Sequence, residues 1–189
     1  MTLTKSIFRK KCLQSMKNAP KHNKLYEMAH VEKNLAIVLK KYRGKKILFY
    51  YPLDFEANII KFLKKMRKKN TLFLPFMEGE SFKMVPFRLP LTRKKFGVYE
   101  AGNSLKHIKN IDIMIAPSIG VDGNFQRVGF GKGMYDRFFA RLHKKPYVIF
   151  VQPKLCFTKQ KICDDYDVTC NLLVTPKIIL KNKDIKDVK

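Results

Sequence analysis

Short, uninterrupted apolar segments alternate along this chain with longer segments of helical periodicity, and this alternation restricts the possible folds most strongly. The apolar segments read as buried strands and span residues 46–52, 71–75, 111–116, 147–151 and 172–175. Helical patterns span 5–16, 24–41 and 56–69, and another helix is expected to begin after Gly133. Strands of this kind separated by helices are typical of a mostly parallel sheet with helices on both faces.

The chain is long enough for one domain with a complete core. It has 189 residues, of which 46% are hydrophobic, as is typical of a globular protein. We therefore expect one α/β domain over residues 1–189, with 177–189 as a basic tail. Residues 82–87 are a further predicted strand, and Pro86 favours an edge position for it. The carboxyl ends of the other strands should meet at one edge and bind the ligand there; these ends are Pro52, Pro75, Pro117, Gln152 and Thr175.

A glycine-rich segment, residues 127–137, is the main candidate for a ligand site. Its glycines at 129, 131 and 133 are bracketed by Arg127, Lys132 and Arg137. Glycines let backbone N–H groups approach an anion closely, and basic side chains neutralise its charge. Asp136 follows in the expected first turn of a helix, and Mg²⁺ prefers one or two carboxylates together with phosphate oxygens. The segment therefore indicates a nucleoside triphosphate with its metal, although glycines that only shape a tight turn would give a similar pattern.

The order of residues from 111 to 137 resembles the signature of the 5-formyltetrahydrofolate cyclo-ligase family, also called methenyltetrahydrofolate synthetases. The resemblance covers residues 5–175 and is densest where an apolar strand ends in proline and the glycine-rich segment follows. Ser118 stands where that family has Gly, and Met134 stands where it has its first Tyr. Neither departure removes a charged group. The positions in register are Arg127, the three alternating glycines, Tyr135, Asp136 and Arg137.

The resemblance implies a three-layer α/β/α sandwich and an ATP- and Mg²⁺-dependent ligase of folate one-carbon metabolism. In that reaction ATP phosphorylates the N5-formyl oxygen of 5-formyltetrahydrofolate. N10 then attacks the activated carbon, and 5,10-methenyltetrahydrofolate, ADP and phosphate are released. Such a reaction needs positioning and charge neutralisation more than a side-chain nucleophile. We expect Arg127 and Lys132 to be the catalytic groups.

ATP is expected to contact the first helix as well as the glycine-rich segment. Lys5 and Arg9 lie four residues apart, so they share one face of that helix. In a lysine-rich chain this pair is equally explained as solvated charge, but the family carries a similar Lys-x-x-x-Arg that contacts ATP. The residues expected to bind ATP are Lys5, Arg9, Arg127, Gly129, Gly131, Lys132, Gly133 and Tyr135.

Glu56 follows the strand that ends at Pro52, and its carboxylate can accept hydrogen bonds from the N–H groups of a pterin ring. From residue type alone, a Glu at a helix start that is favoured by the helix dipole explains it at least as well. The resemblance assigns this Glu to folate binding. The residues expected to bind the folate are Tyr51, Glu56, Phe130, Met134 and Tyr135.

Asp136 and Asp167 are the expected Mg²⁺ ligands. The segment Tyr166-Asp167-Val168 matches a His-Asp segment of the family, with Tyr in place of His. The resemblance therefore implies that Asp167 is a second ligand of the Mg²⁺ ion. The alternative is an ordinary turn Asp in a polar loop.

The net charge of +25, from 40 basic and 15 acidic residues, supports an alternative function as a basic nucleic-acid-binding module. The lysines are spread along the chain, however, and the aromatic residues are not interleaved with them as stacking platforms. We therefore favour the enzyme, in which the same charge attracts an anionic folate, including a polyglutamylated one.

The sequence also predicts where the protein is located. No apolar run is long enough to cross a bilayer, and residues 1–17 carry charges without a signal-peptide core. We expect a cytoplasmic monomer with no membrane partner.

The last three of the four cysteines are spaced by seven, unlike zinc ligand pairs, so we expect all four to be reduced and structural. They are Cys12, Cys156, Cys163 and Cys170.

Overall fold

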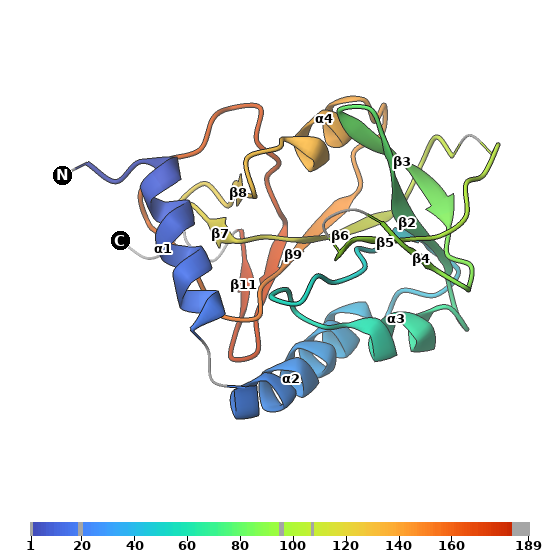
Figure 1. Ribbon diagram of the computed structural model, residues 1–189, viewed down its shortest axis with the longest axis horizontal. Coiled ribbons are helices and arrows are strands. Elements are labelled where there is room, and N and C mark those ends of the chain that lie inside the picture. The colour runs from blue at the N-terminus through green and yellow to red at the C-terminus, as the bar shows by residue number, and fades with distance from the viewer. Residues whose placement is uncertain (1, 19–20, 95–96, 107, 183–189) are drawn as a thin grey trace.

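The computed structural model describes residues 2–18, 21–94, 97–106 and 108–182, with the backbone alone for 21–24. Figure 1 shows a central sheet with helices α2 (Lys21–Leu39) and α3 (Ile60–Met66) below it and α4 (Met134–Ala140) above it. Helix α1 (Lys5–Lys17) lies at one side. The α/β class with helices on both faces of the sheet is confirmed.

The main sheet has seven strands in the order β11-β10-β9-β6-β1-β2-β3. The five central strands, β10, β9, β6, β1 and β2, run parallel to one another, while β3 and β11 pair antiparallel at the two edges. The predicted mostly parallel sheet and the edge strand that contains Pro86 are thus confirmed. The strands are β1 (Lys46–Leu48), β2 (Thr71–Glu78), β3 (Ser81–Pro86), β6 (Ile113–Pro117), β9 (Tyr147–Val151), β10 (Leu172–Val174) and β11 (Ile179–Lys181).

Successive side chains of the central strands enter two different cores, because strand residues alternate between the faces of a sheet. Ile47 packs with residues of α2 and α3, such as Leu35 and Leu63. Its neighbour Leu48 packs on the other face with Phe138 of α4. Both faces are therefore apolar, which explains why these strands have continuous rather than alternating hydrophobic sequences.

Helix α1 packs over a small hairpin of β7 (Gly120–Val121) and β8 (Arg127–Val128). Thr4 caps the helix as its sequence predicts, since its Oγ1 accepts a hydrogen bond from the Ile7 N–H at 3.3 Å. The helix approaches the hairpin so closely that a Cβ at Gly120 would lie 2.5 Å from Phe8 Cε1. This contact fixes α1 beside the segment that leads into the glycine-rich loop.

The prediction of four reduced cysteines is wrong for one pair. Cys12 of α1 and Cys156, which follows β9, form a disulfide across a sequence separation of 144 residues. Cys163 and Cys170 are free. The pairing depends on α1 folding back over the segment after β9, and nothing in the local spacing of the cysteines indicates that contact.

Two predicted elements are shorter than expected around Glu56. Strand β1 ends at Leu48 rather than Pro52, and α3 begins at Ile60 rather than Glu56. Between them Glu56 Oε2 accepts from the Leu53 N–H at 2.9 Å, and Asn58 Oδ1 accepts from the Ile60 N–H at 3.1 Å. Side chains that bind nearby backbone N–H groups favour turns over helix. Glu56 consequently lies in a turn and not in the first turn of a helix.

Several short elements were not expected from the sequence. Strands β4 (Thr92–Arg93) and β5 (Tyr99–Glu100) form a small hairpin in the connection after β3. Residues 179–181 of the expected basic tail form the edge strand β11, while 183–189 lie outside the described residues. Helix α2 spans 21–39 rather than 24–41.

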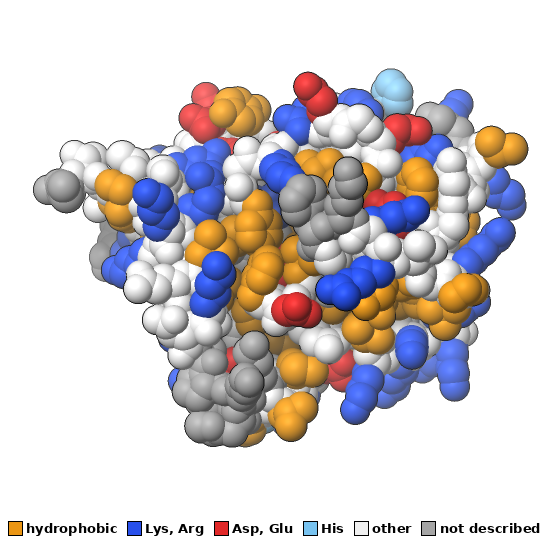
Figure 2. All heavy atoms as spheres, viewed as in Figure 1, with side chains coloured by type: hydrophobic (Ala, Val, Ile, Leu, Met, Phe, Trp, Pro, Cys, Tyr) orange, Lys and Arg blue, Asp and Glu red, His pale blue; other side chains and the backbone are white. Residues whose placement is uncertain are grey.

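The basic side chains are distributed widely over the surface. Figure 2 shows Lys and Arg side chains spread over the face drawn there rather than gathered in one patch. Among the helices that the structure describes, none is long and apolar enough to cross a membrane.

Candidate active site

Two adjacent hollows lie beyond the carboxyl ends of β1, β6 and β9, at an edge where convergent strand ends predict a ligand site. The strand end predicted at Pro75 is wrong, because β2 continues to Glu78. The larger hollow, called the outer cleft here, has a volume of about 310 Å³, at the lower end of the range for small-molecule sites. It lies between α2, the turn at 51–58, Tyr99 and Lys154. The smaller one, called the inner cavity, has room for about 10 Å³, close to the space that one water molecule needs.

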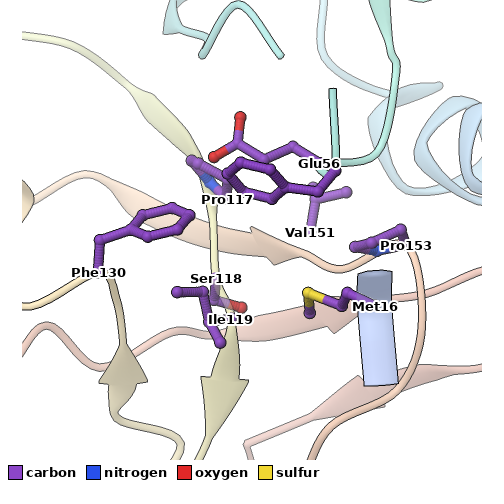
Figure 3. Close-up of a pocket in the computed structure, with 9 residues that line it drawn as sticks. Met16, Glu56, Pro117, Ser118, Ile119, Phe130, Val151 and Pro153 are labelled. Atoms are coloured by element: carbon purple, nitrogen blue, oxygen red, sulfur yellow. The ribbon is translucent and has the colours of Figure 1, made fainter. Parts of the chain in front are cut away.

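The inner cavity lies between the turn that carries Glu56 and the segments that follow β6 and β8. Figure 3 shows Phe130 and Met16 on opposite sides of it, with Ser118 and Ile119 between them. Four residues, Met16, Phe55, Glu56 and Pro153, line both the inner cavity and the outer cleft. Glu56 therefore stands where the two hollows meet.

The Glu56 carboxyl group has an unusual protonation equilibrium. Burial raises its pKa from the ordinary 4.5 to about 7, although the Leu53 N–H and the charge of Arg127 act in the opposite direction. Near neutral pH this group is consequently present both as an acid and as a carboxylate. It can donate a hydrogen bond in one form and accept hydrogen bonds from ring N–H groups in the other.

Arg127 is buried below the glycine-rich loop, and two contacts hold its guanidinium group. Its Nε donates to the Pro117 carbonyl at 2.8 Å, and its Cζ lies 4.7 Å from the centre of the Tyr135 ring. A Cβ at Gly129 would lie 2.4 Å from Arg127 Nη1, so this glycine is needed for the close approach. The charge of Arg127 also lowers the pKa of Glu56, which indicates that both groups act on one region.

Arg9 connects α1 to the same loop. Its Nε donates to the Gly129 carbonyl at 2.7 Å, and a Cβ at Gly131 would lie 3.8 Å from its guanidinium carbon. Gly131 and Gly133 have φ angles of +93° and +58°, which non-glycine residues rarely adopt. Three guanidinium groups thus contact the loop: Arg9 from α1, Arg127 from β8 and Arg137 of α4, which donates to the Lys132 carbonyl. Lys132 of the same loop is exposed.

Lys5 lies on the same helix but interacts with acidic side chains. Its Nζ forms ion pairs with Asp167 and, at 3.0 Å, with Asp164. Burial would lower the pKa of the Lys5 ammonium group, but these hydrogen bonds raise it overall. Without a ligand, therefore, the positive charge of Lys5 is neutralised by the loop before β10 rather than directed at the glycines.

Asp136 and Asp167, the expected metal ligands, come from different segments that meet. Asp136 Oδ1 accepts a hydrogen bond from the Val168 N–H at 3.1 Å, beside Asp167 in the chain. Asp167 Oδ2 accepts from Lys5 and from the Asp164 N–H. Within the part of the chain that the structure describes, no three His, Cys, Asp or Glu side chains are grouped as metal ligands. Asp136 and Asp167 could supply one or two carboxylates to a cation, the number that Mg²⁺ takes beside phosphate oxygens.

The expected folate-binding residues divide into two groups. Tyr51 and Glu56 line the outer cleft, and Phe130 lines the inner cavity, where its ring lies 5.1 Å from Phe55 in an edge-on contact. Met134 and Tyr135 do not line either hollow and instead pack on the core beneath α4. Burial raises the pKa of Tyr135, which keeps its hydroxyl group protonated.

Sequence reasoning did not find several residues that line these hollows. Phe55 adjoins Glu56, and the Tyr99 ring lies tilted against the Tyr51 ring with their centres 5.3 Å apart. Met16 is at the end of α1, and its role depends on how that helix packs. Of these residues, only Phe55 could have been suggested by the sequence, because it adjoins the candidate carboxylate of Glu56.

Comparisons with known proteins agree with the resemblance in the sequence. The model of the 5-formyltetrahydrofolate cyclo-ligase family matches residues 2–176. The chain belongs to this family. A 5-formyltetrahydrofolate cyclo-ligase of Haemophilus influenzae is 21% identical over 120 residues, which cover 59% of this chain and 64% of that protein. The chain thus matches just under two thirds of the length of that curated cyclo-ligase.

Two solved structures of cyclo-ligases, described as methenyltetrahydrofolate synthetases, have the same fold. The NMR structure of the 5,10-methenyltetrahydrofolate synthetase of Aquifex aeolicus is 25% identical, with a TM-score of 0.77 over 96% of this chain and 94% of that one. The 5,10-methenyltetrahydrofolate synthetase of Mycoplasma pneumoniae is 20% identical, with a TM-score of 0.72 over 93% and 100% of the two chains. The three-layer fold expected for a cyclo-ligase is confirmed.

Proposed function

We propose that this cyclo-ligase converts 5-formyltetrahydrofolate to 5,10-methenyltetrahydrofolate with consumption of ATP. The observation that carries the proposal is the position of Glu56 between a cleft of about 310 Å³ and a cavity bordered by the segment from β8 to α4. A folate in the outer cleft and ATP on the glycine-rich loop would meet at the inner cavity. Membership of the family supports this assignment of the two substrates.

In the proposed reaction the N5-formyl oxygen forms a bond to the γ-phosphorus of ATP, and the bond from that phosphorus to ADP breaks. N10 then attacks the formyl carbon and loses its proton. The bond between carbon and the transferred oxygen breaks, and phosphate leaves with that oxygen. Negative charge accumulates on phosphate oxygens throughout, so fixed positive groups are the main requirement.

Arg127 and Arg9 are the residues best arranged to meet that requirement. Both are held by hydrogen bonds to backbone carbonyls, at 2.8 Å and 2.7 Å, so their orientation costs little when ATP binds. Lys132 and the N–H groups of Gly129, Gly131 and Gly133 would contribute the remaining contacts of the phosphates. Lys5 would join them by exchanging Asp167 for a phosphate oxygen.

Glu56 would accept hydrogen bonds from the pterin ring in the outer cleft, where Tyr51 provides an aromatic wall. Asp136 and, directly or through water, Asp167 would hold Mg²⁺ together with phosphate oxygens. When bound, this ion neutralises triphosphate charge. When the ion pair between Lys5 and Asp167 breaks, the Asp167 carboxylate can bind Mg²⁺ and the Lys5 ammonium group can bind a phosphate oxygen. Binding of the metal and binding of ATP would thus depend on the same rearrangement.

The direct test is an absorbance assay for the methenyl product with 5-formyltetrahydrofolate, ATP and Mg²⁺. We expect product that depends on ATP from the wild-type chain and little from an Arg127→Ala variant with an unchanged far-ultraviolet circular dichroism spectrum. Well-folded wild-type protein that forms no product in the presence of ATP would rule the proposal out.

A further inference from the structure

Ser118 carries a buried hydroxyl group for which the structure provides no partner. The residue follows β6 and is only 5% exposed. Within the described part of the chain, its Oγ is the buried side-chain oxygen or nitrogen that lacks a hydrogen bond. Leaving such a group unsatisfied is unfavourable, so a partner from outside the chain is expected.

The backbone on both sides of this hydroxyl group is held in place. The Ser118 N–H donates to the Val151 carbonyl at 3.1 Å, and the preceding Pro117 carbonyl accepts from Arg127. The side chain lines the inner cavity, whose other lining residues, apart from Glu56, are apolar. Figure 3 shows Ser118 on the side of this cavity opposite Glu56. The hydroxyl group is thus fixed and available to a small polar group.

The size of the inner cavity restricts what can reach Ser118. Its volume of about 10 Å³ admits a water molecule or one small substituent but not a pterin ring. The outer cleft, about thirty times larger, is the hollow that can take the ring, and the two share Glu56. The part of 5-formyltetrahydrofolate that is small and polar and lies beside the reacting phosphate is its N5-formyl group.

We infer that the Ser118 hydroxyl group donates a hydrogen bond to the formyl oxygen of the substrate and orients it for phosphoryl transfer. This inference rests on the proposed function. A carbonyl oxygen has two lone pairs, so it can accept from Ser118 with one and bond to phosphorus with the other. Without substrate the cavity has room for one water molecule, which the formyl group would displace.

The test compares two folates, one with and one without the oxygen atom that makes the proposed contact. The dissociation constants of 5-formyltetrahydrofolate and 5-methyltetrahydrofolate are measured without ATP, for wild type and for Ser118→Ala. The methyl compound has a substituent at the same nitrogen but no oxygen. We expect the alanine variant to bind the formyl compound about threefold to tenfold more weakly, the range for one neutral hydrogen bond, and the methyl compound within twofold of wild type.

A second variant protects the test against misfolding. Ser118→Gly, with the residue that the family has at this position, also lacks the donor and adds no bulk to the cavity, so it should show the same selective loss if the alanine variant does not fold. Equal weakening of both folates, or no weakening of either, would overturn the inference while leaving the proposed activity intact. Wild-type protein that binds neither folate would overturn the proposed function and this inference together.

Discussion

The guanidinium carbon of Arg127 lies 4.7 Å from the centre of the Tyr135 ring, so the basic residue of β8 is held against the first turn of α4. Gly129 of the glycine-rich loop permits this arrangement, since a Cβ there would lie 2.4 Å from Arg127 Nη1. A buried cation–π contact of this kind contributes about 2 kcal/mol and restricts the rotation of the side chain. The finding explains how a long, flexible residue can act as a fixed charge.

The first prediction concerns Arg127. We expect Arg127→Lys to lower kcat by about 10²- to 10³-fold, although it keeps the charge, because Lys cannot both bind the Pro117 carbonyl and present a planar group above the ring. Steady-state kinetics measure the effect. Arg67, whose guanidinium carbon lies 5.5 Å from the Phe87 ring in a separate contact, is the matched control, and Arg67→Lys should leave kcat unchanged. Wild-type kcat in a folded Arg127→Lys variant would remove Arg127 from the reaction.

The second prediction concerns the pH dependence of folate binding. Because burial raises the pKa of Glu56 to about 7, the carboxylate that accepts ring N–H groups is lost as the pH falls through 7. We expect kcat/KM for the folate to decline below pH 7 in the wild-type protein. In Glu56→Gln the value should be low and nearly independent of pH across this interval. A variant with the wild-type profile would show that another group titrates.

The same shift predicts a change in stability. Between pH 4.5 and about 7 the folded protein retains a proton on Glu56 that the unfolded chain releases, so the free energy of unfolding decreases as the pH rises through this window. The interval corresponds to at most about 3 kcal/mol. Glu56→Gln keeps an acceptor for the Leu53 N–H, so it should melt several degrees above wild type at pH 8 and together with it at pH 4. Equal shifts at both values would contradict this origin.

The third prediction concerns magnesium. Asp136→Asn retains an acceptor for the Val168 N–H but loses the charge, so the fold should persist while the Mg²⁺ concentration for half-maximal activity rises at least tenfold. Asp164 is exposed and pairs with Lys5 and Tyr166, and Asp164→Asn serves as the control with the same change of charge. A magnesium titration beside a thermal melt separates the outcomes. An unchanged titration curve with a lower melting temperature would make Asp136 structural.

The fourth prediction concerns the disulfide between Cys12 and Cys156. It closes 144 residues of chain, and a loop of this length corresponds to roughly 5 kcal/mol of chain entropy in the unfolded state. Replacing both cysteines with Ser should therefore lower the melting temperature markedly under oxidising conditions. Cys163→Ser, at a free cysteine, should change it little. If a reductant lowers the wild-type melting temperature no more than that of the double variant, the disulfide does not stabilise the protein.

Most of the sheet could be predicted from the sequence because its central strands are apolar on both faces. Tyr147–Val151 was predicted at its observed bounds for this reason. The turn at Glu56 was missed because it depends on side chains that compete for backbone N–H groups, a local effect that hydrophobic periodicity does not report. Strand β11 was not predicted because its residues were assigned to a basic tail.

The site was only partly predictable for a different reason. Arg127 and the glycines are adjacent in the sequence, so their common site has a local signature. The ion pair of Lys5 with Asp167 joins residues 162 positions apart, and the disulfide of Cys12 depends on the same packing of α1. The missing hydrogen-bond partner of the Ser118 hydroxyl group can be recognised only from the structure, because it depends on which residues surround that group.

The most direct test of the proposed reaction follows one oxygen atom. The protein is supplied with 5-formyltetrahydrofolate labelled with ¹⁸O in the formyl group, together with unlabelled ATP and Mg²⁺ in ordinary water, and the released phosphate is analysed by mass spectrometry. If the formyl oxygen is phosphorylated, one labelled oxygen should appear in each phosphate for every methenyl product. Product formed with unlabelled phosphate, and with the label in water, would contradict phosphoryl transfer to the formyl group.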